Sequence, residues 1–120
     1  MPDPGSSDSR VSADLVMLPA EIAAQSLSQT QIILPRDAAL AAIAHLAKEG
    51  RRVVNWEGWV KFKDGTRAKS LTHGGSFALP RDAMKAAEVA KTGIERSQSH
   101  WDRNPEYEGT VLYFVVNFGD

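Results

Sequence analysis

The sequence predicts an α+β domain: a mostly antiparallel sheet of about four strands with two or three helices packed on one side. Two kinds of pattern support this fold class. Three segments open with a Leu-Pro motif typical of a helix start, and four others show the alternation or the continuous apolar run of a strand. After residue 29 the order is strand, helix, strand, strand, helix, strand, which suits helices laid against one side of a sheet.

Length and composition exclude several classes of protein. With 120 residues, 42% hydrophobic and 24% charged, the chain can build one modest core and not two. A net charge of −1 argues against binding nucleic acid over the whole surface. Cysteine is absent, which excludes disulfides, thiolate metal ligands and a cysteine nucleophile.

The beginning of the chain is rich in Pro, Gly, Ser and Asp. We therefore expect a disordered lead over residues 1–12 and a single α+β domain over residues 13–120. Asp3 and Asp8 stand where an export signal needs positive charge and then an apolar run. The longest apolar run, Val111 to Val116, is far shorter than a membrane span of ~20 residues. A soluble, cytoplasmic protein is the expectation.

The three helix starts share one pattern: Leu, Pro, any residue, an acid, then an apolar residue. Proline suits the first helical position, and an acid in the first turn favours the positive end of the helix dipole. Their unequal spacing indicates helix punctuation rather than an internal duplication. The predicted helices are Pro19 to about Ser28, Pro35 to Glu49, and Pro80 to about Ser99. Gly93 is a candidate for an early end or a bend in the third.

The first long strand, Arg52 to Phe62, alternates one apolar face with one polar face. The loop Lys63-Asp64-Gly65 then predicts a hairpin in which Gly65 takes a left-handed conformation. Three loop residues give the register Phe62 with Thr66, Val60 with Ala68, Lys61 with Arg67, and Trp59 with Lys69. This register gathers the small and apolar residues on one face.

The outer strands are less constrained by the sequence. Thr30 to Leu34 predicts a short strand, and Thr110 to Phe118 predicts an inner strand buried on both faces. The segment 76–79 could add or replace a strand. The order of elements is also compatible with a ferredoxin-like arrangement, but order does not fix topology. Because the sheet must end somewhere, self-association through an edge strand stays open.

Tryptophan and arginine are the residue types that most often anchor protein interfaces. Trp59 falls on the polar face of its strand, whereas Trp56 falls on the apolar face unless a bulge at Gly58 brings both to one side. The loop after the third helix adds further aromatic residues among charges. The candidate partner-binding residues are Trp59, Lys61, Arg67, Lys69, Trp101 and Tyr107.

Two alternatives remain. The stretch 48–70 holds seven basic and three acidic residues, a net charge of +4, so the hairpin 51–70 could instead bind nucleic acid by stacking bases and holding phosphates. A small enzyme around the glycine-rich loop at His73 would need His100 or the acids Glu106 and Glu108 to converge on it. The spacing of the histidines matches no common metal pattern, so we predict no catalytic residue, no metal and no cofactor.

The motifs Trp56-Glu57-Gly58-Trp59, Asp64-Gly65 and Leu112-Tyr113-Phe114 resemble those of small bacterial immunity proteins, which neutralise a partner toxin by binding it. The resemblance spans about residues 53–118 and implies a non-enzymatic binding protein, with no catalytic residues to transfer. Immunity proteins against nucleases are often strongly acidic, and this nearly neutral chain with its basic hairpin departs from that pattern. We therefore predict a domain that binds another protein, in the form of an immunity-type inhibitor or otherwise.

Overall fold

One antiparallel sheet organises the chain in the computed structural model, which describes residues 12–75, 79–105 and 109–119. Its strands are β1 (Ile32–Pro35), β2 (Arg52–Lys61), β3 (Arg67–Gly75) and β4 (Val111–Gly119). They lie in the order β1-β4-β2-β3, and every neighbouring pair is antiparallel. The last strand of the chain is therefore an inner strand, as predicted. A ferredoxin-like sheet has parallel strands at its centre, so this topology differs from it.

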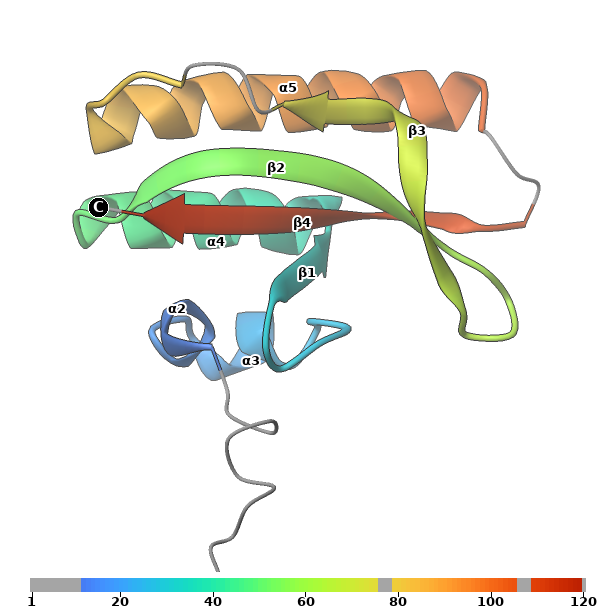
Figure 1. Ribbon diagram of the computed structural model, residues 1–120, viewed down its shortest axis with the longest axis horizontal. Helices are drawn as coiled ribbons and strands as arrows, with labels where there is room; N and C mark the ends of the chain where they lie inside the picture. The colour runs from blue at the N-terminus through green and yellow to red at the C-terminus, as the bar shows by residue number, and fades with distance from the viewer. Residues whose placement is uncertain (1–11, 76–78, 106–108, 120) are drawn as a thin grey trace, which may run out of the picture.

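Two long helices pack on one face of this sheet and confirm the α+β fold class. They are α4 (Arg36–Lys48) and α5 (Ala83–Arg103). In Figure 1, α4 lies behind β4, and β3 passes in front of α5. Between the two layers lies a core whose central side chains have no solvent exposure, among them Leu34, Ile43, Leu46, Val60, Ile94 and Phe114.

The starts and ends of the long helices differ in part from the prediction. α4 begins at Arg36, directly after Pro35, which is its N-cap. α5 begins at Ala83 rather than Pro80, because the carboxylate of Asp82 caps it there, and it continues to Arg103. It also runs through Gly93 without ending.

A close approach between α5 and β2 explains the glycine within that helix. A Cβ atom added at Gly93 would lie only 2.6 Å from Cζ2 of Trp56. Trp56 is 6% exposed, and its ring centroid lies 5.9 Å from that of Phe114. The missing side chain therefore lets the helix lie directly on the tryptophan.

The segment before β1 folds as two single-turn helices, so the helix predicted from Pro19 to Ser28 starts where expected but ends after one turn. They are α2 (Ala13–Val16) and α3 (Ala20–Ala23). Polar contacts tie this segment to the end of α4: Nε of Arg51 lies 2.9 Å from Oδ1 of Asp14, and Nε2 of His45 is hydrogen-bonded to the carbonyl oxygen of Met17 at 3.0 Å. His45 is half-buried as a result.

The β2–β3 hairpin has the predicted register. Its pairs are Trp59 with Lys69, Val60 with Ala68, and Lys61 with Arg67. The N–H of Phe62 donates to the carbonyl of Thr66 at 2.9 Å, and Gly65 has a φ of 93°, the left-handed conformation that favours glycine. Beyond Lys69 the strand continues to Gly75, so the segment 72–75, expected to be a loop, is part of β3.

Trp56 and Trp59 point to opposite faces of the sheet. Against β4, the register of β2 runs without interruption from Asn55 to Lys61, and two residues three apart in a regular strand face opposite ways. The bulge against β4 lies between Val53 and Asn55, so Val53 is buried where the alternation predicted Val54. The register shift at Gly58 affects only the pairing with β3.

Candidate functional site

No helix in the described part of the chain covers the face of the sheet opposite α4 and α5, and we call it the open face. Its side chains alternate along each strand with the residues of the core. The open face consists of Ile33 and Pro35 on β1, Asn55, Glu57, Trp59 and Lys61 on β2, Arg67 and Lys69 on β3, and Val111, Tyr113, Val115 and Asn117 on β4.

The two ends of the open face differ in exposure. Near β1, Ile33 and Val115 are 2% and 1% exposed, so this end is already covered. At the hairpin end, Val111 is 51% exposed, which corrects the expectation that β4 is buried on both faces along its whole length. The accessible part, which we call the hairpin patch, consists of Trp59, Lys61, Arg67, Lys69, Val111 and Tyr113.

An aromatic pair forms the centre of the hairpin patch. Trp59 and Tyr113 lie directly opposite each other on the two inner strands, and both are half-buried. The indole Nε1 of Trp59 is shielded from solvent and has no hydrogen-bond acceptor among the described residues. Nζ of Lys61 lies 6.0 Å from the centroid of the Tyr113 ring, at the outer limit of a cation–π contact.

Charged side chains surround the pair, and only some of their charge is compensated. Nζ of Lys69 lies 3.2 Å from Oε1 of Glu57. The guanidinium of Arg67 donates to the backbone carbonyl of Leu27 at 3.3 Å, a contact that fixes its position but does not offset its charge. No described carboxylate forms an ion pair with Lys61.

The structure keeps four of the six candidate binding residues together and removes one. Trp59, Lys61, Arg67 and Lys69 share the hairpin patch. Trp101 does not join them, because it belongs to the last turn of α5 rather than to a loop and is 5% exposed in the core. Its position two helical turns after Ile94, on the same apolar stripe, is the signal that could have placed it there. Tyr107 lies outside the described residues.

Tyr113 is the residue that the sequence reasoning missed. It was expected to be buried in a strand covered on both sides. Its true position depends on β4 pairing with β2, which places it opposite Trp59.

The structure adds nothing in favour of a small enzyme. His45 lies in α4, His73 in β3 and His100 in the last turn of α5. Within the described ranges, no group of three His, Asp or Glu residues could hold a metal ion. Glu106 and Glu108 fall outside those ranges.

The pKa of Asp64 is lowered by hydrogen bonds from the hydroxyl and the backbone N–H of Thr66, which is a property of the hairpin turn.

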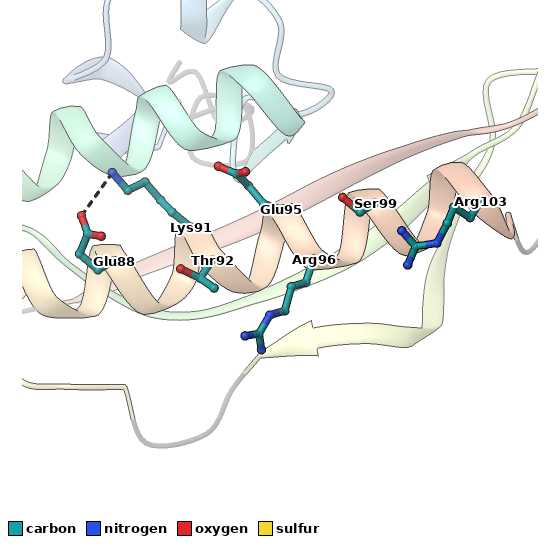
Figure 2. Close-up of a pocket in the computed structure, with 7 residues that line it drawn as sticks. All are labelled: Glu88, Lys91, Thr92, Glu95, Arg96, Ser99 and Arg103. Carbon is teal, nitrogen blue, oxygen red and sulfur yellow. Dashed lines mark ion pairs between the residues drawn. The ribbon is translucent and has the colours of Figure 1, made fainter.

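A depression of about 660 Å³ runs along the outer side of α5. It is lined by Glu88, Lys91, Thr92, Glu95, Arg96, Ser99 and Arg103. All seven come from one helix, and Figure 2 shows their side chains spreading in different directions rather than meeting at one point. Apart from the Lys91–Glu88 ion pair at 3.7 Å, they form no cluster that could act on a substrate.

A second, more apolar hollow of about 400 Å³ lies between α2 and α3. Leu15, Leu18 and Ala23 contribute to its lining. Val16, which also lines it, and Met17 beside it are 69% and 39% exposed, but none of the described lining residues carries a charge that could orient a ligand.

Comparison with protein-family models, with curated proteins and with solved structures gives no match. None of the helices in the described part of the chain has the length and apolar character needed to cross a membrane. The hairpin patch is therefore the feature from which a function can be argued.

Proposed function

We propose that the protein acts by binding another protein through the hairpin patch. The observation that carries this proposal is the Trp59–Tyr113 pair, placed on the two inner strands of a face that no described helix covers. Protein interfaces typically have an aromatic centre inside a polar rim, with Trp, Tyr and Arg as their most common anchors. Lys61, Arg67 and Lys69 supply such a rim.

An immunity-type inhibitor is the finer form of this proposal, and its support is the resemblance in sequence. Within Trp56-Glu57-Gly58-Trp59, only Glu57 and Trp59 belong to the open face, because Trp56 and Gly58 are buried. A toxin held by this protein would therefore contact every second residue of the motif, together with Tyr113 on the neighbouring strand.

The test is affinity capture from a lysate of the source organism, with nuclease present and with elution in a salt gradient. Trp59→Ala should abolish retention of a stoichiometric protein partner, with a loss of ~2 kcal/mol or more in affinity, as expected for an interface anchor. Val89→Ala is the matched control, because Val89 is 50% exposed on α5, away from the open face. Equal retention by both variants would exclude the hairpin patch as the binding site.

Single-stranded nucleic acid is the second candidate ligand. Aromatic rings on the inner strands of a four-stranded sheet, next to cations, are the arrangement on which RNA-binding sheets stack bases. The ion pair between Lys69 and Glu57 speaks against it, because it leaves fewer free cations for the several phosphate contacts that nucleic acid needs. Nucleic acid retained by the protein and released steeply as salt rises would favour this candidate.

A further inference from the structure

The charges of the hairpin patch also indicate which chemical group its partner must supply. Lys61 and Arg67 stand directly opposite each other on β2 and β3. Directly opposite residues have their Cβ atoms ~5 Å apart, and like charges in that position destabilise a sheet. No described carboxylate offsets this repulsion, since none forms an ion pair with either cation.

Other contacts hold the two cations in place without neutralising them. Arg67 uses one donor on the carbonyl of Leu27, and a guanidinium has five. Lys61 is half-buried beside the ring of Tyr113. A neutral partner that covered this patch would remove water from two unpaired positive charges, which is unfavourable unless the partner also brings a counter-charge.

We infer that Lys61 and Arg67 together form a carboxylate-binding site, and that the partner protein fills it with an acidic side chain. This inference rests on the proposed function, of which it names the partner chemistry. The side chain beside that acid is apolar or aromatic, because Val111 lies in the same cross-strand row as the two cations and Tyr113 lies in the next row. The distribution of charge supports an acidic partner. The stretch 48–70 has a net charge of +4, whereas the whole chain has a net charge of −1.

A phosphate could also lie between two cations, but the neighbouring residues favour a protein ligand. Lys69 is already paired with Glu57, so only Lys61 and Arg67 remain to bind an anion. Nucleic acid needs several phosphate contacts for useful affinity. The exposed Val111 offers an apolar contact of the kind that a peptide side chain uses.

Selection from a random-peptide display library on the immobilised full chain tests the inference without knowledge of the natural partner. Wild-type protein should enrich peptides that carry Asp or Glu beside an apolar or aromatic residue. A synthetic copy of an enriched peptide should bind the double variant Lys61→Gln/Arg67→Gln about tenfold more weakly or worse. The matched control Lys85→Gln/Arg96→Gln removes two exposed cations from α5 and should leave affinity unchanged.

A second readout separates recognition from folding. Because the double variant relieves the repulsion between Lys61 and Arg67, its thermal midpoint should be equal to that of the wild type or higher. Weaker binding together with undiminished stability would support a site maintained for a ligand. A lower thermal midpoint would show that the two cations serve the fold and would overturn the inference.

The outcomes distinguish this inference from the proposed function. Peptides that need Trp59 but contain no acid, or that keep full affinity for the double variant, would overturn the carboxylate site and leave the proposed function standing. Peptides that bind equally well to Trp59→Ala, or no enrichment at all, would count against both. An oligothymidylate that binds more tightly than any enriched peptide, and displaces it, would overturn both in favour of nucleic acid.

Discussion

The same five residues, Leu-Pro-Arg-Asp-Ala, stand at Leu34–Ala38 and at Leu79–Ala83, and the two copies begin their helices at different points. In the first copy the helix starts at the arginine, and the proline is the N-cap. In the second the helix starts at the final alanine, and the aspartate is the N-cap. Identical local chemistry is therefore used in two ways within one chain.

The strand that precedes the first copy explains the difference. Leu34 pairs with Phe114 and Pro35 with Tyr113, so the chain is fixed in the sheet up to the proline and turns into the helix at once. Asp37 then falls inside the first turn, where its carboxylate contacts the neighbouring Arg36 at 2.7 Å. The Asp37 side chain is 88% exposed and that of Arg36 is 41% exposed, so this ion pair adds little stability.

None of the residues of the second copy is paired in the sheet, and the last described residue of β3 is Gly75. The backbone of Asp82 is therefore free to take the extended conformation of an N-cap, with φ −70° and ψ 126°. Its Oδ2 accepts a hydrogen bond from the N–H of Lys85 at 2.9 Å, which satisfies one of the unpaired donors of the first turn. The pentapeptide thus marks a helix start, and tertiary pairing selects the residue at which it occurs.

The leucines of the two copies should differ most. Leu34→Ala should cost about 3 kcal/mol of the free energy of unfolding, because that side chain is fully buried between sheet and helices. Leu79→Ala should cost about 1 kcal/mol, because Leu79 is half-buried at the edge of the core. Urea denaturation of both variants measures the difference. Equal losses would show that the strand does not distinguish the copies.

Substitution of Gly93 tests how closely α5, the helix that follows the second copy, must pack on β2. Gly93→Ala should destabilise the protein by about 1–2 kcal/mol, since the clash with Trp56 exceeds the gain of about 1 kcal/mol in helix propensity. The exposed neighbour in Thr92→Ala is the control and should be neutral or slightly stabilising. A stabilised Gly93→Ala variant would mean that α5 can move away from β2 at little cost.

The aspartates give the most direct comparison of the two copies. Asp82→Ala should cost about 1 kcal/mol through loss of the cap, whereas Asp37→Ala should cost only about 0.3 kcal/mol through the helix dipole. Asp82→Asn retains an acceptor and should be close to wild type. Thermal unfolding of the three variants decides the matter, and a larger loss from Asp37→Ala would reverse the assignment of the caps.

The same contrast explains which features the sequence could predict. The hairpin register followed from Lys63-Asp64-Gly65 and the alternation around it, because a turn and the strands beside it are local. The helix starts were predictable to within a few residues for the same reason. The choice of the capping residue depended on the pairing of Leu34 with Phe114, which lie 80 positions apart.

The residues of the candidate site likewise divide into those that local sequence could place and those that depend on distant strand pairing. Trp59, Lys61, Arg67 and Lys69 could be placed on one face from the hairpin alone. Tyr113 could not, because its position depends on β4 inserting between β1 and β2, and element order does not determine strand order. Trp101 lies beyond the predicted helix end at about Ser99, although the apolar stripe that includes Ile94 continues to it.

A third aspartate can be compared with Asp37 and Asp82, and it gives the smallest expected effect. Asp64 in the hairpin loop accepts hydrogen bonds from Oγ1 of Thr66 at 2.6 Å and from its backbone N–H at 3.0 Å. These bonds favour the charged form and hold the pKa of the carboxyl below its usual value of 3.8. Like Asp82, and unlike Asp37, this aspartate fixes a local backbone turn.

The lowered pKa of Asp64 gives the sign of its pH dependence. Its contribution to stability is present above the unfolded pKa and is lost as pH falls through the lower, folded pKa. Thr66→Ala should raise the pKa of Asp64 toward its usual value, but not all the way, because the backbone N–H still donates. Thr66→Ser retains both donors and should keep the pKa low. An NMR titration of the Asp64 carboxyl carbon distinguishes these cases, and an unchanged pKa in Thr66→Ala would show that the hydroxyl contributes nothing to the turn.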